Sequence, residues 1–244
     1  LMLDKQRLGK LISERLELEG TSETLPLKNF VQHYKNPVYT VTIAMCGKYT
    51  KLPDAYKSVI EAFIHSGVEN NASVKLKWIA TENLYSKNQV EREFSEVNGI
   101  LLLPGFGKRG AEGKILACQV AREQNIPFLG ICLGLQCAVI EFARNVCGLL
   151  KANSTEFNTK TPFPVIDLME SQRMVKMKGG TMRLGKYDCE LTPGSKAKKE
   201  YRKKKISERH RHRWEVNNRY RSKLEKNGMV FSGINPELNL VEII

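Results

Sequence analysis

The residues with the clearest potential for chemistry lie in PFLGICLGLQ, residues 127–136, where Cys132 stands between two glycines. The segment 130–134 has the form G-x-C-x-G, the thiol counterpart of the G-x-S-x-G turn that presents a catalytic serine. Glycines at this spacing permit a tight turn from a strand into a helix. The start of that helix is expected to favour the thiolate and to lower the thiol pKa. The alternative is a small apolar thiol in a buried turn.

A second glycine-bearing turn lies in LLLPGFGKRG, residues 101–110, directly after an apolar run. If the two apolar runs are neighbouring parallel strands, Gly105 and Phe106 should lie beside Cys132. A free backbone N–H in this turn would then help to form an oxyanion hole for a tetrahedral intermediate. The alternative is an ordinary loop between a strand and a helix.

The elements around these turns alternate between strand and helix. Strand-like segments and helical segments follow one another as VYTVTIAMCGKY, DAYKSVIEAFIHSG, SVKLKWIAT, NQVEREFSEV, GILLLPG, GAEGKILACQVAREQN, IPFLGICLG and LQCAVIEFARNVCG. Continuous apolar strands separated by helices predict an α/β fold with a largely parallel central sheet and helices on both faces. Binding sites in such folds lie at the carboxyl ends of the strands. After about Lys151 the order is less regular, and TPFPVID, GGTMRLGKY and VEII predict shorter strands.

The first 37 residues differ from the rest. Residues 1–20 have a helical spacing of leucines and predict one amphipathic helix. Residues 21–37 are polar, contain two prolines and predict a linker. We therefore expect residues 1–37 to be an appendage with a linker, and residues 38–244 to form the main domain.

Composition limits the remaining function classes. The chain has 244 residues and a net charge of +13, but thirteen Lys or Arg against three Glu fall within 196–223. This stretch lacks regularly interleaved aromatic residues, so it favours a solvated face or a site for one anionic partner over nucleic-acid binding. Within it, KAKKEYRKKK (196–205) favours a mobile solvated loop over a binding surface. No apolar run is long enough to cross a membrane. The six cysteines are scattered without metal-ligand spacing, which indicates reduced thiols in the cytoplasm.

Several longer segments carry a resemblance to a known family. PFLGICLGLQ resembles the nucleophile segment of class I, or triad, glutamine amidotransferases. The glutaminase domain of the CTP synthase family is matched more closely, in order along the chain, by GTSETLPL, GKYTKLPDAYKSVIEA, GFGKRGAEGK, ANSTEF, GGTMRLG, ERHRHRWEVNN and LVEII.

The resemblance implies roles for individual residues. Cys132 would attack the side-chain amide of glutamine, form a glutamyl thioester and release ammonia. Glu156 would bind the α-ammonium group of glutamine and Arg213 its α-carboxylate, which suits the chemistry of both side chains. The oxyanion hole and the glutamine pocket would be formed by Gly105, Phe106, Leu133, Gly134, Leu135 and Gln136.

Two features depart from the family pattern. Pro104 occupies a position where the family commonly has glycine, and because proline has no N–H, the following residues must supply the oxyanion hole. The general base is also missing. The family's catalytic His and Glu form His-Pro-Glu a little beyond LVEII, so we expect them beyond Ile244. The domain 38–244 would then be truncated at its C-terminal end, and these 244 residues alone would be nearly inactive.

The resemblance also implies partners outside this domain. Ammonia would pass to a synthetase domain of the same polypeptide, which aminates UTP to CTP with ATP and Mg²⁺, while GTP activates glutamine hydrolysis. Residues 1–37 would be the end of that domain and the interdomain linker, and the enzyme would be a homotetramer. The glutaminase domain itself would need no metal or cofactor. Arg109 and Gly110 could make a regulatory contact or lie in a solvated loop.

Two other functions remain open from the residues. One is another enzyme with the same type of nucleophile, such as a different amidotransferase or a γ-glutamyl hydrolase. The other is a non-catalytic module whose basic segment binds an anionic partner.

Overall fold

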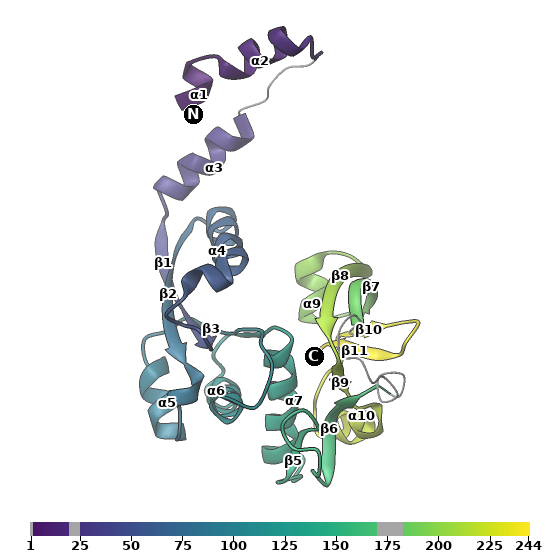
Figure 1. Cartoon of the computed structure of the whole chain (residues 1–244). Coiled ribbons are helices and arrows are strands. Elements are labelled where there is room, and N and C mark those ends of the chain that lie inside the picture. The colour runs from purple at the N-terminus through teal and green to yellow at the C-terminus, as the bar shows by residue number, and fades with distance from the viewer. Residues whose placement is uncertain (1, 20–24, 170–182) are drawn as a thin grey trace. The chain divides into compact units, whose positions relative to one another are not determined.

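The computed structural model describes residues 2–19, 25–169 and 183–244 (Figure 1). These residues form two compact units, Leu1–Ile43 with Lys51–Leu76, and Ala44–Thr50 with Lys77–Ile244. The division passes through two strands of the first sheet. The predicted boundary between residues 37 and 38 stays a prediction.

The N-terminal segment is more broken, and more helical, than the sequence predicts. Two short helices, α1 (Met2–Lys5) and α2 (Leu8–Leu16), replace the single expected helix, because Arg7 adopts a left-handed conformation with φ 53°. The predicted linker contains a third helix, α3 (Leu25–Lys35). Its proline, Pro26, lies in the first turn, where a helix needs no N–H from it.

The first sheet has the strand order β2-β1-β3-β4. Its members are β1 (Tyr39–Gly47), β2 (Ala72–Ala80), β3 (Gly99–Leu102) and β4 (Phe128–Gly130). β3 and β4 are parallel, with Leu102 opposite Gly130. The Leu103 N–H donates to the Cys46 carbonyl at 2.9 Å, so β1 and β3 also end side by side.

Helices connect these strands and cover the sheet. The connections are η1 (Pro53–Tyr56), α4 (Lys57–Glu69), η2 (Thr81–Asn83), α5 (Lys87–Phe94), α6 (Ala111–Glu123) and α7 (Leu133–Asn145). α6 packs against both α5 and α7. Leu102, Leu133 and Ile140 belong to the buried core that joins this sheet to its helices. The predicted α/β class with a parallel sheet is therefore confirmed.

The remainder of the chain forms two smaller sheets. One has the order β11-β10-β7-β8 and is antiparallel throughout. The other has the order β5-β6-β9. The elements after α7 are β5 (Ala152–Ser154), β6 (Phe163–Leu168), β7 (Arg183–Leu191), α9 (Lys196–Tyr201), β8 (Lys205–His212), β9 (Trp214–Val216), η3 (Asn218–Tyr220), α10 (Arg221–Lys226), β10 (Gly233–Asn235) and β11 (Leu240–Ile243).

Most of the basic stretch 196–205 is helix α9, and β8 starts at Lys205, so the prediction of a loop throughout this stretch is wrong. Ser195 caps α9 by accepting a hydrogen bond from the Lys198 N–H. β8 then pairs with β7 in the antiparallel direction (Figure 1). Lys205 lies opposite Glu190 at one end of the pairing, and His212 lies opposite Arg183 at the other. The positive charges project from a strand whose backbone is satisfied by its neighbour. Residues 179–182 of the predicted strand GGTMRLGKY lie outside the described residues.

In the described ranges no helix is both long and apolar enough to cross a membrane. All six cysteines are unpaired, and only Cys132 is not buried.

Candidate active site

Cys132 lies at the junction between β4 and α7. It is the N-cap residue of α7 and has the dihedral angles φ 55° and ψ −105°. A non-glycine residue with positive φ is strained, and such strain is typical of functional sites. The thiol is half-buried, and the Leu133 N–H at the start of α7 acts to lower its pKa. The turn therefore presents the sulfur at the start of a helix, as the G-x-C-x-G pattern predicts.

The two glycines of this turn are required by close backbone packing. A Cβ atom on Gly130 would lie 2.7 Å from the Gly134 carbonyl carbon. A Cβ atom on Gly134 would lie 2.8 Å from the Leu102 carbonyl oxygen. Both distances are too short for any other residue type. The glycines thus let α7 start directly against the end of β3.

The loop 103–107 follows β3 and reaches the same end of the sheet. An added Cβ atom on Gly105 would lie 3.6 Å from Leu133 Cδ2, so this loop adjoins the residue after the nucleophile. In the described part of the chain, the backbone N–H groups of Gly105 and Phe106 have no acceptor. The Phe106 side chain is 75% exposed. Two unsatisfied donors thus lie in the loop where the sequence predicts an oxyanion hole.

Two buried lysines hold this loop, and sequence reasoning missed both. Lys114 of α6 donates a hydrogen bond to the Leu103 carbonyl, and Lys48 donates to the Phe106 carbonyl. The exposed fractions of Lys114 and Lys48 are 1% and 8%. Burial lowers the pKa of both ammonium groups. The sequence feature that could have identified Lys114 is its position on a helix face shared with the apolar Ala111, Ile115 and Cys118.

Glu156 holds the end of the same loop. Its Oε1 accepts a hydrogen bond from the Gly107 N–H at 2.6 Å. Burial raises the pKa of the Glu156 carboxyl group, while the Gly107 hydrogen bond and the Lys48 charge oppose that rise. Within the described residues Oε2 forms no hydrogen bond. Glu156 is therefore placed to present one carboxylate oxygen to a ligand while the other fixes the loop.

The environment of Cys132 corrects one expectation. The pKa of the thiol is raised, mainly because burial disfavours the thiolate, and the carboxylates of Glu156 and Glu215 raise it further. The Leu133 N–H and the Lys114 charge act in the opposite direction. The start of α7 alone does not outweigh these effects. The surroundings of the thiol therefore favour its protonated form.

Gln136 connects α7 to β9. Its Nε2 donates to the Trp214 carbonyl at 2.9 Å, and its Oε1 is buried without a partner in the described chain. Arg213 is the residue before Trp214 and lies in the bend between β8 and β9. The Arg213 guanidinium is half-buried and forms no ion pair with any described residue. Arg213 is thus adjacent in sequence to the residue that Gln136 of α7 contacts.

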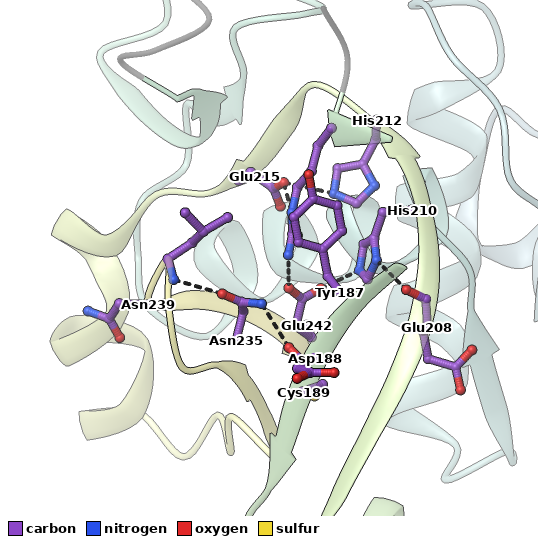
Figure 2. A network of polar contacts seen from close by, with 12 residues as sticks. Tyr187, Asp188, Cys189, Glu208, His210, His212, Glu215, Asn235, Asn239 and Glu242 are labelled. Atoms are coloured by element: carbon purple, nitrogen blue, oxygen red, sulfur yellow. Dashed lines mark hydrogen bonds and ion pairs between the residues drawn. The ribbon is translucent and has the colours of Figure 1, made fainter. Parts of the chain in front are cut away.

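A network of paired charges supports the same bend (Figure 2). His212 Nε2 lies 2.8 Å from Glu215 Oε1. This contact joins the residues on either side of Arg213 and Trp214. Arg183 connects Glu215 at 3.4 Å to Glu242 at 2.5 Å, although all three side chains are buried. In Figure 2 the rings of His210 and Tyr187 lie beside these carboxylates.

None of the four histidines hydrogen-bonds to Cys132. His210 Nε2 lies 2.5 Å from Glu242 Oε2, and His212 is held by Glu215. His65 packs against Phe30 with ring centroids 5.1 Å apart, and His33 is exposed on α3. In the described chain no histidine is therefore placed to act as a base for Cys132. Among these residues there is also no cluster of three His, Cys, Asp or Glu that could hold a metal ion.

The structure thus brings most of the predicted site residues to one region. Gly105 and Leu133 are in contact range, and the charge of Glu156 acts on Cys132. Leu133 and Gly134 are buried where α7 meets β3, and Leu135 packs against the core as a partly buried residue. Arg213 is connected to Cys132 only indirectly, through Trp214 and Gln136. The roles of these residues in binding glutamine stay predictions.

Comparison with known proteins agrees with this geometry. Residues 51–244 match the family model described as glutamine amidotransferase class-I. The chain is 56% identical over 246 residues to the CTP synthase of Cytophaga hutchinsonii, and the match covers 100% of this chain and 46% of that protein. The CTP synthase of Chlorobium phaeobacteroides is 55% identical over 250 residues, with 44% of its length covered. The chain therefore spans less than half the length of these relatives.

A solved structure gives the same assignment. The structure described as the Trypanosoma brucei CTPS glutaminase domain with bound acivicin is similar at a TM-score of 0.76 and 36% sequence identity. The match covers 83% of this chain and 78% of that one. The chain belongs to the class-I glutamine amidotransferase family, in the group formed by the glutaminase domains of CTP synthases.

Proposed function

We propose that this domain hydrolyses L-glutamine through a thioester on Cys132. The observation that carries the proposal is the pairing of a strained cysteine at the start of α7, φ 55°, with a neighbouring loop whose Gly105 and Phe106 N–H groups have no acceptor in the described chain. A nucleophile and free donors at one end of a parallel sheet suit acyl transfer.

The chemistry divides into two steps. The Cys132 sulfur attacks the side-chain carbonyl carbon of glutamine, a base takes the thiol proton, and the oxygen gains negative charge. The C–N bond then breaks, and the nitrogen leaves with that proton as ammonia. Water attacks the resulting thioester, which releases glutamate and restores the thiol. The N–H groups of Gly105 and Phe106 would stabilise the oxyanion in both steps.

The substrate's charged groups suggest the rest of the site. The Glu156 carboxylate, with Oε2 uncommitted among the described residues, would bind the α-ammonium group. The Arg213 guanidinium, without an ion pair in the described chain, would bind the α-carboxylate. A base would be needed to take the proton of the Cys132 thiol, and no histidine of the described chain hydrogen-bonds to Cys132.

For the whole enzyme we propose the activity of its relatives. Ammonia would pass to a synthetase domain that converts UTP to CTP with ATP and Mg²⁺, and GTP would activate the glutaminase. Support comes from the similarity to proteins named CTP synthase. A homotetramer in the cytoplasm is part of the same proposal, and six unpaired cysteines fit a reducing compartment.

The test is chemical labelling of Cys132 in the full-length enzyme. Acivicin, a glutamine analogue with an electrophilic ring, should form one covalent adduct, which mass spectrometry of peptides should map to Cys132. L-Glutamine should protect against labelling and should be hydrolysed to glutamate and ammonia in a 1:1 ratio.

The matched variants are Cys132→Ala and Cys147→Ala, the second at a buried thiol just after α7. We expect Cys132→Ala to abolish both labelling and ammonia release, and Cys147→Ala to preserve both. Labelling at another cysteine, or glutamine hydrolysis by Cys132→Ala, would refute the proposal. Hydrolysis of γ-glutamyl peptides at a rate above that of glutamine would indicate a γ-glutamyl hydrolase instead.

A further inference from the structure

We propose that Lys114 is a positioning residue for the reaction at Cys132, because its ammonium group fixes the first residue of the oxyanion loop and places a positive charge behind it. This inference rests on the proposed glutaminase function and adds a residue to it.

Lys114 is an unusual member of the core. It is among the largest fully buried side chains, at 1% exposure, and lies on the face of α6 that is otherwise apolar. Lysines are almost never fully buried unless they are paired with an acid. Lys114 has no ion pair with any described residue. Its hydrogen-bond acceptor is the carbonyl of Leu103.

That contact is made at the start of the oxyanion loop. Leu103 is fully buried and precedes Pro104, which has no N–H of its own. The Lys114 Nζ lies 3.8 Å from the position of a Cβ atom added to Gly105. The ammonium group thus holds the Leu103 carbonyl and adjoins the Gly105 backbone. With that carbonyl fixed, the Gly105 N–H stays available for an oxyanion.

The charge of Lys114 also acts on the nucleophile. The groups that affect the Cys132 thiol are the Leu133 N–H and the charges of Glu156, Glu215 and Lys114. Both carboxylates oppose the thiolate, and Lys114 is the cation that favours it. Around Lys114 itself stand Lys48 and the thiols of Cys118, Cys132 and Cys137. A negative charge that develops on sulfur or on the oxyanion would therefore be stabilised by Lys114.

The experiment compares Lys114→Met with Lys114→Gln in the full-length enzyme. Met keeps the length of the side chain but removes both the charge and the donor, whereas Gln removes the charge and keeps an N–H donor. Lys77→Met is the matched control, because the Lys77 ammonium also donates to a backbone carbonyl, that of Glu93 at 2.7 Å. The measurements are kcat and KM for glutamine, and the rate of Cys132 alkylation by iodoacetamide from pH 6 to pH 10.

We expect Lys114→Met to lower kcat about tenfold, less than the loss of a direct oxyanion donor, with KM changed by less than about twofold. Lys114→Gln should recover part of kcat. Alkylation of Cys132 should move to higher pH in both variants, since both lack the positive charge. Lys77→Met should match the wild type in every measurement.

A purely structural role for Lys114 predicts a different result. The inference is overturned if folded Lys114→Met has the kcat and the alkylation profile of the wild type. Circular dichroism establishes folding, and Lys114→Gln decides the question if the Met variant does not fold. If the wild-type enzyme releases no ammonia from glutamine, the glutaminase proposal fails, whereas the alkylation profiles still decide whether Lys114 acts on Cys132.

Discussion

Two groups of buried charge in this protein are built in opposite ways. The elbow cluster consists of Lys48, Lys114 and Glu156, which hold the loop 103–107 beside Cys132. The strand network consists of Arg183, His210, His212, Glu215 and Glu242 on β7, β8, β9 and β11. In the strand network each carboxylate contacts both Arg183 and a histidine ring. In the elbow cluster Lys114 and Glu156 hydrogen-bond to backbone atoms, the Leu103 carbonyl and the Gly107 N–H.

The difference shows what each group can do. Mutually paired charges neutralise one another and hold strands together, so their main effect is on stability. A charge that is bonded to a backbone dipole and not to an opposite charge, as at Lys114, keeps its field, which acts on whatever charge develops nearby. We therefore expect changes in the strand network to affect unfolding most, and changes in the elbow cluster to affect chemistry most.

The largest expected effect on stability is at Arg183. Its guanidinium connects Glu215 and Glu242 and lies 4.1 Å from the centroid of the Tyr187 ring. Arg183→Met would leave two buried carboxylates without this cation and should reduce the free energy of unfolding by about 3–5 kcal/mol. Urea denaturation at pH 7 measures the change.

In the elbow cluster, the change that corresponds to Arg183→Met is Lys114→Met, which also removes a buried cation. It leaves no buried acid behind, and the loss of one carbonyl hydrogen bond is offset by removal of a buried charge. Its free energy of unfolding should stay within about 1.5 kcal/mol of the wild type. Equal destabilisation by Lys114→Met and Arg183→Met would contradict the distinction between the two groups.

The next effect is at Gly134, where the elbow meets β3. Gly134→Ala would place a Cβ atom 2.8 Å from the Leu102 carbonyl oxygen, a backbone atom that cannot easily move. We expect a loss of about 1–3 kcal/mol in the free energy of unfolding, together with loss of acivicin labelling at Cys132. Gly148→Ala is the control, since Gly148 has φ +71° but open space around it. It should cost about 1 kcal/mol and leave labelling unchanged.

A smaller, pH-dependent effect is expected at His210. The hydrogen bond with Glu242 raises the pKa of His210 above its ordinary value near 6.5. The pKa of Glu242 is lowered from 4.5 because its hydrogen bonds with His210 and Arg183 outweigh the effect of burial. The His210 contribution is complete below pH 6.5 and is lost as the pH rises through the raised pKa. The Glu242 contribution is complete above pH 4.5 and is lost as the pH falls through the lowered pKa.

The pair should therefore stabilise the fold most at about pH 5–6.5. Urea denaturation of wild type and His210→Gln should show a larger difference at pH 5.5 than at pH 9. A difference that is constant or grows with pH would show that His210 does not act as a cation in this network.

The smallest effect is expected at the surface of the same sheet. Lys205 Nζ lies 2.7 Å from Asp188 Oδ2, but both side chains are exposed, at 52% and 40%. Lys205→Met should change the free energy of unfolding by less than about 0.5 kcal/mol, because water and salt screen this pair. A change as large as that of Arg183→Met would show that burial does not decide how much an ion pair contributes to the stability of this protein.

Sequence reasoning identified the elements whose signals are local. The alternation of apolar strands and amphipathic helices predicted the α/β core, and the glycines around Cys132 predicted the turn into α7. It failed where the decisive contact is distant. The stretch from Lys205 forms a strand only because it pairs with β7. Two local features were also missed, the helix α9 within the basic stretch and the left-handed Arg7 that divides the first helix.

The sequence by itself determined the tight turn that carries Cys132 and the alternation of strands and helices in the α/β core, because each depends on residues that are neighbours in the chain, whereas the role of Cys132 as nucleophile stays a prediction. Only the tertiary structure decided which charges are paired. Arg183 meets Glu242 across 59 positions, and Lys114 reaches the Leu103 carbonyl from the next helix. It also reversed the expected pKa shift of Cys132, because burial and two carboxylates outweigh the favourable start of α7.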